Sequence, residues 1–156
     1  MKKAFRSWAP RESYRCDAAV VWCFDNRFEL GLRKFLKRLG ILNPDAIKVA
    51  GGAKCLASPE QELEREFVLD QIRKSMRLHG TTRVILMVHS DCGAYGGLAG
   101  GFGGDAHAEA EHHERELRRA AATVAERLPG IEVRSYFVDF EGIWEVEPDG
   151  TPGSQS

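Results

Sequence analysis

Two short segments of the chain carry residue types that bind transition metals. The first is Cys23-Phe24-Asp25-Asn26-Arg27 and the second is His89-Ser90-Asp91-Cys92-Gly93. Together they offer two thiolates, an imidazole and a carboxylate, which are ligands that zinc accepts in tetrahedral sites. The sequence therefore predicts a zinc site in which Cys23, His89 and Cys92 bind the metal and a fourth position is exchangeable.

Asp25 lies two residues after Cys23, and its spacing leaves two roles open. The carboxylate can bind the metal as a conditional fourth ligand, or it can accept a hydrogen bond from a metal-bound hydroxide and orient it toward an electrophile. Arg27 can decide between these roles, because a planar guanidinium holds a carboxylate bidentately and keeps it ionised. A purely structural ion pair between Asp25 and Arg27 is the alternative.

The elements that must position these residues are buried strands. Apolar runs at residues 18–22 and 84–88 come directly before Cys23 and His89. The crevice beyond the carboxyl ends of parallel strands is where α/β sheets bind their ligands. We therefore expect the two segments to meet at one edge of a sheet.

The remaining pattern alternates between strands and helices. An amphipathic helix ends at Gly40, a short strand follows at 47–50, and Ser58 with Gln61 predicts a capped helix that ends at Gly80. A long polar helix ends before Pro129, and strands are expected around 133–138 and, as an added edge, at 143–146. This alternation predicts the α/β class, as a three-layer sandwich with a mostly parallel central β-sheet flanked by helices.

Several other residues near these elements have plainer interpretations. Asp91 is predicted to be a turn or cap residue, not a ligand. The glycine-rich stretch at 93–104 is either a mobile lid or a flexible connector. His107, His112 and His113 lie in an acidic helical segment, which favours a solvated helix face.

Length and composition indicate one domain. The chain has 156 residues, of which 43% are hydrophobic, enough for a single core. We divide it into an N-terminal arm (1–17), a zinc domain (18–147) and a flexible tail (148–156). A net charge of −1 gives no broad case for binding nucleic acid or an anionic membrane. With no apolar run long enough to span a bilayer and no disulfide framework among four cysteines, a cytoplasmic location is expected.

The pattern Cys23-x-Asp25-x-Arg27 with His89-x-x-Cys92-Gly93 resembles the paired zinc signature of the β-class carbonic anhydrases. The resemblance extends over about residues 20–97. It implies Zn²⁺ as cofactor, held by Cys23, His89 and Cys92, and an Asp25–Arg27 catalytic dyad. It also implies reversible hydration of carbon dioxide to bicarbonate by zinc-bound hydroxide, in a homodimer or higher homo-oligomer.

The chain departs from that family at two places. Its N-terminal arm is short, and residues 47–52 replace an arginine–asparagine pair near the second strand. Some relatives with similar zinc ligands hydrolyse carbon disulfide or carbonyl sulfide, so the ligands alone leave that substrate class open. A non-catalytic zinc-binding protein, in which Asp25 closes the metal permanently, is the other alternative.

Overall fold

A computed structural model describes residues 1–148 of the chain. Within these residues, the strands form one sheet in the order β2-β1-β3-β4-β5. Neighbouring strands are parallel except β5, which runs antiparallel to β4 at one edge. The predicted mostly parallel sheet, with 143–146 as an added edge strand, is confirmed. The strands are β1 (Ala18–Trp22), β2 (Pro44–Lys48), β3 (Arg83–His89), β4 (Glu132–Val138) and β5 (Ile143–Val146).

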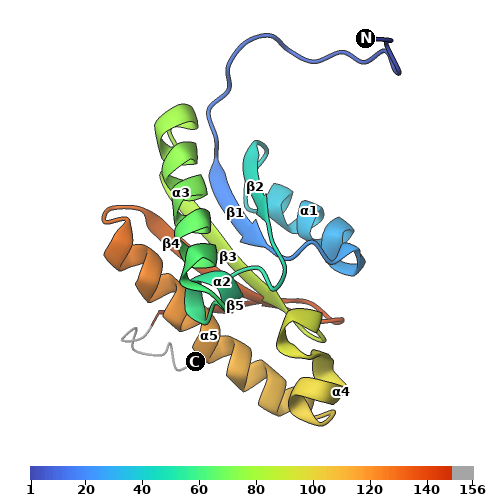
Figure 1. Ribbon diagram of the computed structural model, residues 1–156, viewed down its shortest axis with the longest axis vertical. Coiled ribbons are helices and arrows are strands. Elements are labelled where there is room, and N and C mark those ends of the chain that lie inside the picture. The colour runs from blue at the N-terminus through green and yellow to red at the C-terminus, as the bar shows by residue number, and fades with distance from the viewer. Residues whose placement is uncertain (149–156) are drawn as a thin grey trace.

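Helices cover both faces of this sheet and make three layers (Figure 1). α1 (Glu29–Arg38) packs on one face through Leu32 and Leu36. The opposite face is covered by α2 (Lys54–Ala57), α3 (Glu62–His79) and α5 (Ala106–Arg127). The α/β sandwich expected from the sequence is therefore confirmed. The remaining elements are α4 (Gly97–Phe102) and two 3-10 turns, η1 (Asn26–Phe28) and η2 (Gly93–Tyr95).

β1 and β3 lie side by side inside the sheet, which explains their apolar sequences. All five side chains of β1 are buried, because alternate residues of a strand point to opposite faces and both faces are covered. Ala19 and Val21 enter the core under α3 and α5. Val20 and Trp22 enter the core under α1. This burial fixes where β1 ends and therefore where Cys23, the next residue, lies.

Two predicted boundaries are wrong. The second strand is Pro44–Lys48, not 47–50, because pairing with β1 aligns Pro44 with Ala18 and Lys48 with Trp22. The third helix begins at Glu62 after Gln61, not at Ser58. Ser58 instead ends the short helix α2, and its hydroxyl donates to the buried carboxylate of Glu116.

The prediction of a solvated histidine face is correct for His107 and wrong for His113. The side chain of His107 is 85% exposed, whereas that of His113 is fully buried. His113 lies four and eleven residues before Leu117 and Val124, so all three occupy the helix face that packs on the sheet. The glycine-rich stretch, predicted as a lid or connector, instead forms η2 and α4.

The N-terminal arm has no helix or strand through residue 15 and extends away from the sheet (Figure 1). It joins the body at Tyr14, whose hydroxyl donates to Asp45, and at Cys16, whose backbone N–H donates to the carbonyl of His79. Of the predicted tail, residues 149–156 lie outside the described residues. The division into arm, domain and tail stays a prediction.

No helix within residues 1–148 is both long and apolar enough to cross a bilayer. The cytoplasmic location expected from the sequence also stays a prediction.

Candidate metal centre

The structure brings Cys23, His89 and Cys92 together at the carboxyl ends of two neighbouring strands. Cys23 follows β1 directly, and His89 is the last residue of β3. The chain leaves β1 toward α1 on one face, and it leaves β3 toward α5 on the other. At such a switch point the two connections diverge and leave a crevice between them. The site lies where the strand pattern predicted it.

The ligand atoms of these three residues all lie within 4.8 Å of one another. All three residues are buried, and no hydrogen-bond partner meets Nε2 of His89. Its Nδ1 lies 2.8 Å from the carbonyl oxygen of Ser90, which can only accept, so Nδ1 carries the proton and Nε2 presents its lone pair. A buried lone pair facing two sulfur atoms is an unsatisfied group that a metal ion would satisfy.

The electrostatics of the two cysteines also fit a cation. The hydrogen bond with Cys92 lowers the pKa of the Cys23 thiol to about 4. The same pairing raises the pKa of Cys92. The pairing therefore favours ionisation of one sulfur, and a metal ion bound by both would displace the remaining proton. The Cys-His-Cys set has the donor types and number of a zinc site with one open position.

A glycine allows the β2–α2 turn to approach these ligands closely. Gly52 has a φ of +57°, and a Cβ atom there would lie 2.3 Å from the carbonyl oxygen of Met87 and 3.0 Å from the backbone nitrogen of Cys23. Only glycine combines this left-handed conformation with so close a contact. The turn therefore packs directly against the ends of the two strands that carry the ligands.

Asp25 and Arg27 form a bidentate ion pair beside the cluster. Nη2 of Arg27 donates to Oδ2 of Asp25 at 2.7 Å, and Nε donates to both carboxylate oxygens at 3.1 Å. This guanidinium lowers the pKa of Asp25 to about 2. Oδ2 of Asp25 lies 3.9 Å from Nε2 of His89. The carboxylate is thus ionised, turned toward Arg27 and next to the ligand cluster without belonging to it.

Two residues near the site have contacts that sequence reasoning missed. Asp91 was predicted only as a turn or cap residue; its φ is +55° and its carboxylate accepts from the backbone of Leu98, as expected of a turn. It also pairs with Arg27. Glu109 is 1% exposed and accepts from Ser90 and Asp91. Its position eight residues before Leu117, on the buried face of α5, is the signal that could have found it.

Comparison with known proteins gives the family. Residues 14–148 match the protein family described as "Putative carbonic anhydrase". The chain belongs to this carbonic anhydrase family. It is 25% identical over 128 residues to an uncharacterized protein of Rickettsia bellii (strain RML369-C), covering 81% of the chain and 78% of that protein. It is 24% identical over 128 residues to an uncharacterized protein of Rickettsia conorii (strain ATCC VR-613 / Malish 7), covering 81% and 69%.

One solved structure with a similar fold is a β-carbonic anhydrase. The β-carbonic anhydrase isoform I of Trichomonas vaginalis is 12% identical, with a TM-score of 0.60, over 91% of this chain and 88% of that one. A structure from a study of two tetrameric β-carbonic anhydrases of Sordaria macrospora is 20% identical, with a TM-score of 0.49, over 86% and 82%. The chain thus belongs to the putative carbonic anhydrase family and has a fold similar to that of a β-carbonic anhydrase, in agreement with the resemblance of its motifs.

Proposed function

We propose that this carbonic anhydrase family member binds zinc through Cys23, His89 and Cys92 and hydrates carbon dioxide reversibly to bicarbonate. The observation that carries the proposal is the unpaired, buried Nε2 of His89, which faces two cysteines beside a carboxylate held by Arg27. Three protein ligands leave one position for water, as catalysis by a zinc site requires. When bound by these three residues, zinc supplies the Lewis acidity that makes a water molecule nucleophilic near neutral pH.

The roles of the neighbouring side chains follow from their geometry. Two thiolates neutralise the charge of a zinc ion, so the residues around it must contribute more to activating water. Asp25 accepts a hydrogen bond from the attacking water and directs its lone pair toward the carbon of carbon dioxide. Arg27 keeps Asp25 ionised and turned away from direct metal binding. If Arg27 released it, Asp25 could take the open position and close the site.

The deciding experiment is stopped-flow hydration of carbon dioxide by purified protein of measured zinc content, from about pH 6 to pH 9. We expect stoichiometric zinc and fast turnover. Asp25→Asn and Arg27→Ala should keep zinc and lower the rate roughly 100-fold, the usual size of a lost acid–base contribution. Asp70→Asn, which removes an exposed ion pair with Lys74, is the matched control and should leave the rate unchanged.

Two other outcomes would redirect the proposal. Sulfide release from carbon disulfide or carbonyl sulfide, without carbon dioxide hydration, would give the site a sulfur-containing substrate on the same ligands. Stoichiometric zinc without turnover of any of the three substrates would indicate a closed, binding-only site. Full activity in both Asp25→Asn and Arg27→Ala would reject the dyad while leaving the metal site intact.

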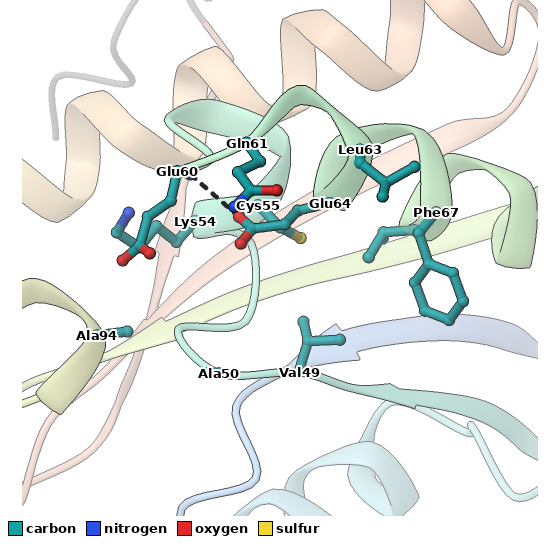
Figure 2. A pocket seen from close by; sticks show the side chains of 11 residues that line it. Val49, Ala50, Lys54, Cys55, Glu60, Gln61, Leu63, Glu64, Phe67 and Ala94 are labelled. Atoms are coloured by element: carbon teal, nitrogen blue, oxygen red, sulfur yellow. Dashed lines mark hydrogen bonds between the residues drawn. The ribbon is translucent and has the colours of Figure 1, made fainter.

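We also propose that the chain forms a homodimer through a groove beside α3. The groove has a volume of about 510 Å³, and Figure 2 shows Phe67 pointing from α3 toward Val49 across it. Leu63 and Phe67 are 74% and 55% exposed, so these side chains and the groove together offer an apolar surface for a partner to cover. The rim carries both Lys54 and Glu60. A two-fold interface must match itself, and a rim with both signs of charge satisfies that requirement.

Sedimentation analysis tests this surface. The unmodified chain should sediment as a dimer, and Phe67→Glu should sediment as a monomer because it places a charge in an apolar contact. Leu78→Glu is the control: Leu78 is 64% exposed on the same helix and does not line the groove. A monomeric unmodified chain would reject the dimer, and a dimeric Phe67→Glu variant would place the interface elsewhere.

A further inference from the structure

Arg27 contacts a second carboxylate through the edge of its guanidinium that carries both Nη atoms. Its Nη1 donates to Oδ2 of Asp91 at 3.0 Å, and its Nη2 donates to the backbone carbonyl of Asp91 at 3.1 Å. Nε and Nη2 are directed to Asp25. Every nitrogen of the guanidinium therefore has an acceptor, and the plane of the group is fixed from both ends.

Asp91 is itself held in an unusual conformation. Among residues 1–148 it is the only residue other than glycine with a positive φ. The backbone N–H of Leu98 donates to its Oδ1 at 2.9 Å, which leaves Oδ2 for Arg27. Asp tolerates the left-handed region because its short side chain can bond to nearby backbone in this way.

Glu109 on α5 fixes the backbone of Asp91 by accepting its N–H. Its Oε1 accepts the N–H of Asp91 at 2.7 Å, and its Oε2 accepts the hydroxyl of Ser90. The carboxylate is 1% exposed, and burying it is unfavourable unless such donors satisfy it. Both oxygens are directed to the two residues between His89 and Cys92, so α5 anchors the loop that carries these ligands.

We propose that Asp91 is a positioning residue for the Asp25–Arg27 pair and that the buried Glu109 acts through it. The connection runs from α5 through Glu109 to Asp91, then through Arg27 to Asp25. It rests on the proposed function, because the pair has a role only if the centre is catalytic. Without the Asp91 carboxylate, Nη1 of Arg27 loses its acceptor. Arg27 keeps its hydrogen bonds to Asp25 and to the backbone carbonyl of residue 91, and its contacts with the rings of Phe28 and Phe140. With 45% of its side chain exposed, the guanidinium is then held less firmly, and so is the orientation of Asp25.

The Asp91→Asn variant separates this role from folding. Asparagine keeps an oxygen for the N–H of Leu98 and tolerates a positive φ, but it presents an amide to Arg27 in place of a carboxylate. The side chains of Arg27 and Asp91 are 45% and 40% exposed, and exposed ion pairs contribute little to stability. The unfolding midpoint and zinc content should therefore match those of the unmodified chain, and Asp70→Asn again serves as the control.

The first readout is NMR of the arginine guanidinium groups in the zinc-loaded, full-length protein. Hydrogen bonds at both Nη atoms slow rotation about the Nε–Cζ bond, which interchanges the two Nη positions, so Arg27 should give separate Nη signals. In Asp91→Asn these signals should merge, whereas Asp70→Asn should leave them separate. This readout does not depend on any catalytic activity.

The second readout is carbon dioxide hydration. We expect Asp91→Asn to lower kcat/KM roughly 10-fold, as for other groups that orient a metal site, and Glu109→Gln to act in the same direction. In an Arg27→Ala background, Asp91→Asn should have no further effect, because it acts through Arg27. Merged Nη signals in a protein whose unmodified form does not hydrate carbon dioxide would support the positioning and reject the proposed function. Separate signals in Asp91→Asn, or an undiminished rate in an active protein, would overturn the positioning role.

Discussion

Oδ2 of Asp25 lies 3.9 Å from Nε2 of His89, while the same oxygen accepts from Nη2 of Arg27 at 2.7 Å. Two ligands of one tetrahedral zinc ion, each at about 2.0–2.1 Å from the metal, lie roughly 3.3 Å apart. Asp25 therefore lies farther from His89 than a fourth ligand would, and it is not part of the cluster formed by Cys23, His89 and Cys92. The contacts of Arg27 oppose a rotation of the carboxylate that would bring it closer.

Removal of a predicted ligand should release the metal without unfolding the chain. Cys92→Ser should reduce bound zinc from stoichiometric to substoichiometric, because the serine hydroxyl stays protonated and is a poor zinc ligand. Metal analysis by mass spectrometry after dialysis against a weak chelator measures this. Cys55→Ser is the control, since Cys55 is also buried but lies outside the cluster and donates to the carbonyl of Gly52. Equal zinc content in the two variants would remove Cys92 from the site.

The close approach at Gly52 should make Gly52→Ala destabilising. The added methyl would meet backbone atoms at 2.3 and 3.0 Å in a left-handed conformation, so we expect a loss of roughly 2 kcal/mol or more in the free energy of unfolding. Gly31→Ala should have the opposite effect: Gly31 lies within α1 with nothing within 4 Å of the added atom, and alanine stabilises helices by roughly 0.5–1 kcal/mol over glycine. Urea unfolding measures both, and a Gly52→Ala variant of unchanged stability would contradict the geometry.

The buried imidazole of His113 should make the protein less stable in mild acid. Neither ring nitrogen has a hydrogen-bond partner, and burial lowers the pKa of His113 from 6.5 to about 3. Between these values the unfolded chain binds more protons than the folded one, so stability falls with decreasing pH by up to about 1.4 kcal/mol per pH unit. Replacing His113 with leucine should remove this contribution.

The measurement is urea unfolding of His113→Leu and the unmodified chain at pH 7 and pH 5. The variant should lose less stability on acidification, while the control His107→Leu, at an 85% exposed position, should behave like the unmodified chain. Oε1 of Glu109 lies 3.8 Å from Nε2 of His113. Protonation of His113 at or above pH 6.5, measured by NMR, would contradict this prediction. It would indicate that His113 forms an ion pair with Glu109 in the folded protein.

Limited proteolysis tests the predicted boundary of the arm. The arm is exposed through Arg15 and is attached to the body from Tyr14 onward, so trypsin should cleave after Arg6 and Arg11 and leave the domain intact. The last Lys or Arg of the chain is Arg134, within β4, so trypsin reports on the arm without cutting the tail. Mass spectrometry identifies the products, and resistance at Arg6 and Arg11 would mean that another surface covers the arm.

The strands and the Cys-His-Cys cluster could be predicted from the sequence because both have strong local signals. The apolar runs before Cys23 and His89 are typical of strands covered on both faces, and parallel strands bring such ends to one edge. The helix start predicted at Ser58 was wrong because of a long-range contact. Its capping pattern was genuine, but its hydroxyl has a distant acceptor on Glu116, and no local pattern contains that acceptor.

By itself, the sequence determined the α/β class, the Cys-His-Cys set and its place at the ends of two strands, since ligand chemistry and apolar burial are properties of short segments. Only the tertiary structure decided what surrounds the set. The contacts of Asp91 with Arg27 and of Glu109 with Asp91 join residues 64 and 18 positions apart. Burial on α5 likewise turned His113 from an expected surface residue into a core residue. These outcomes depend on how helices pack across the sheet, and such long-range packing leaves little trace in local spacing.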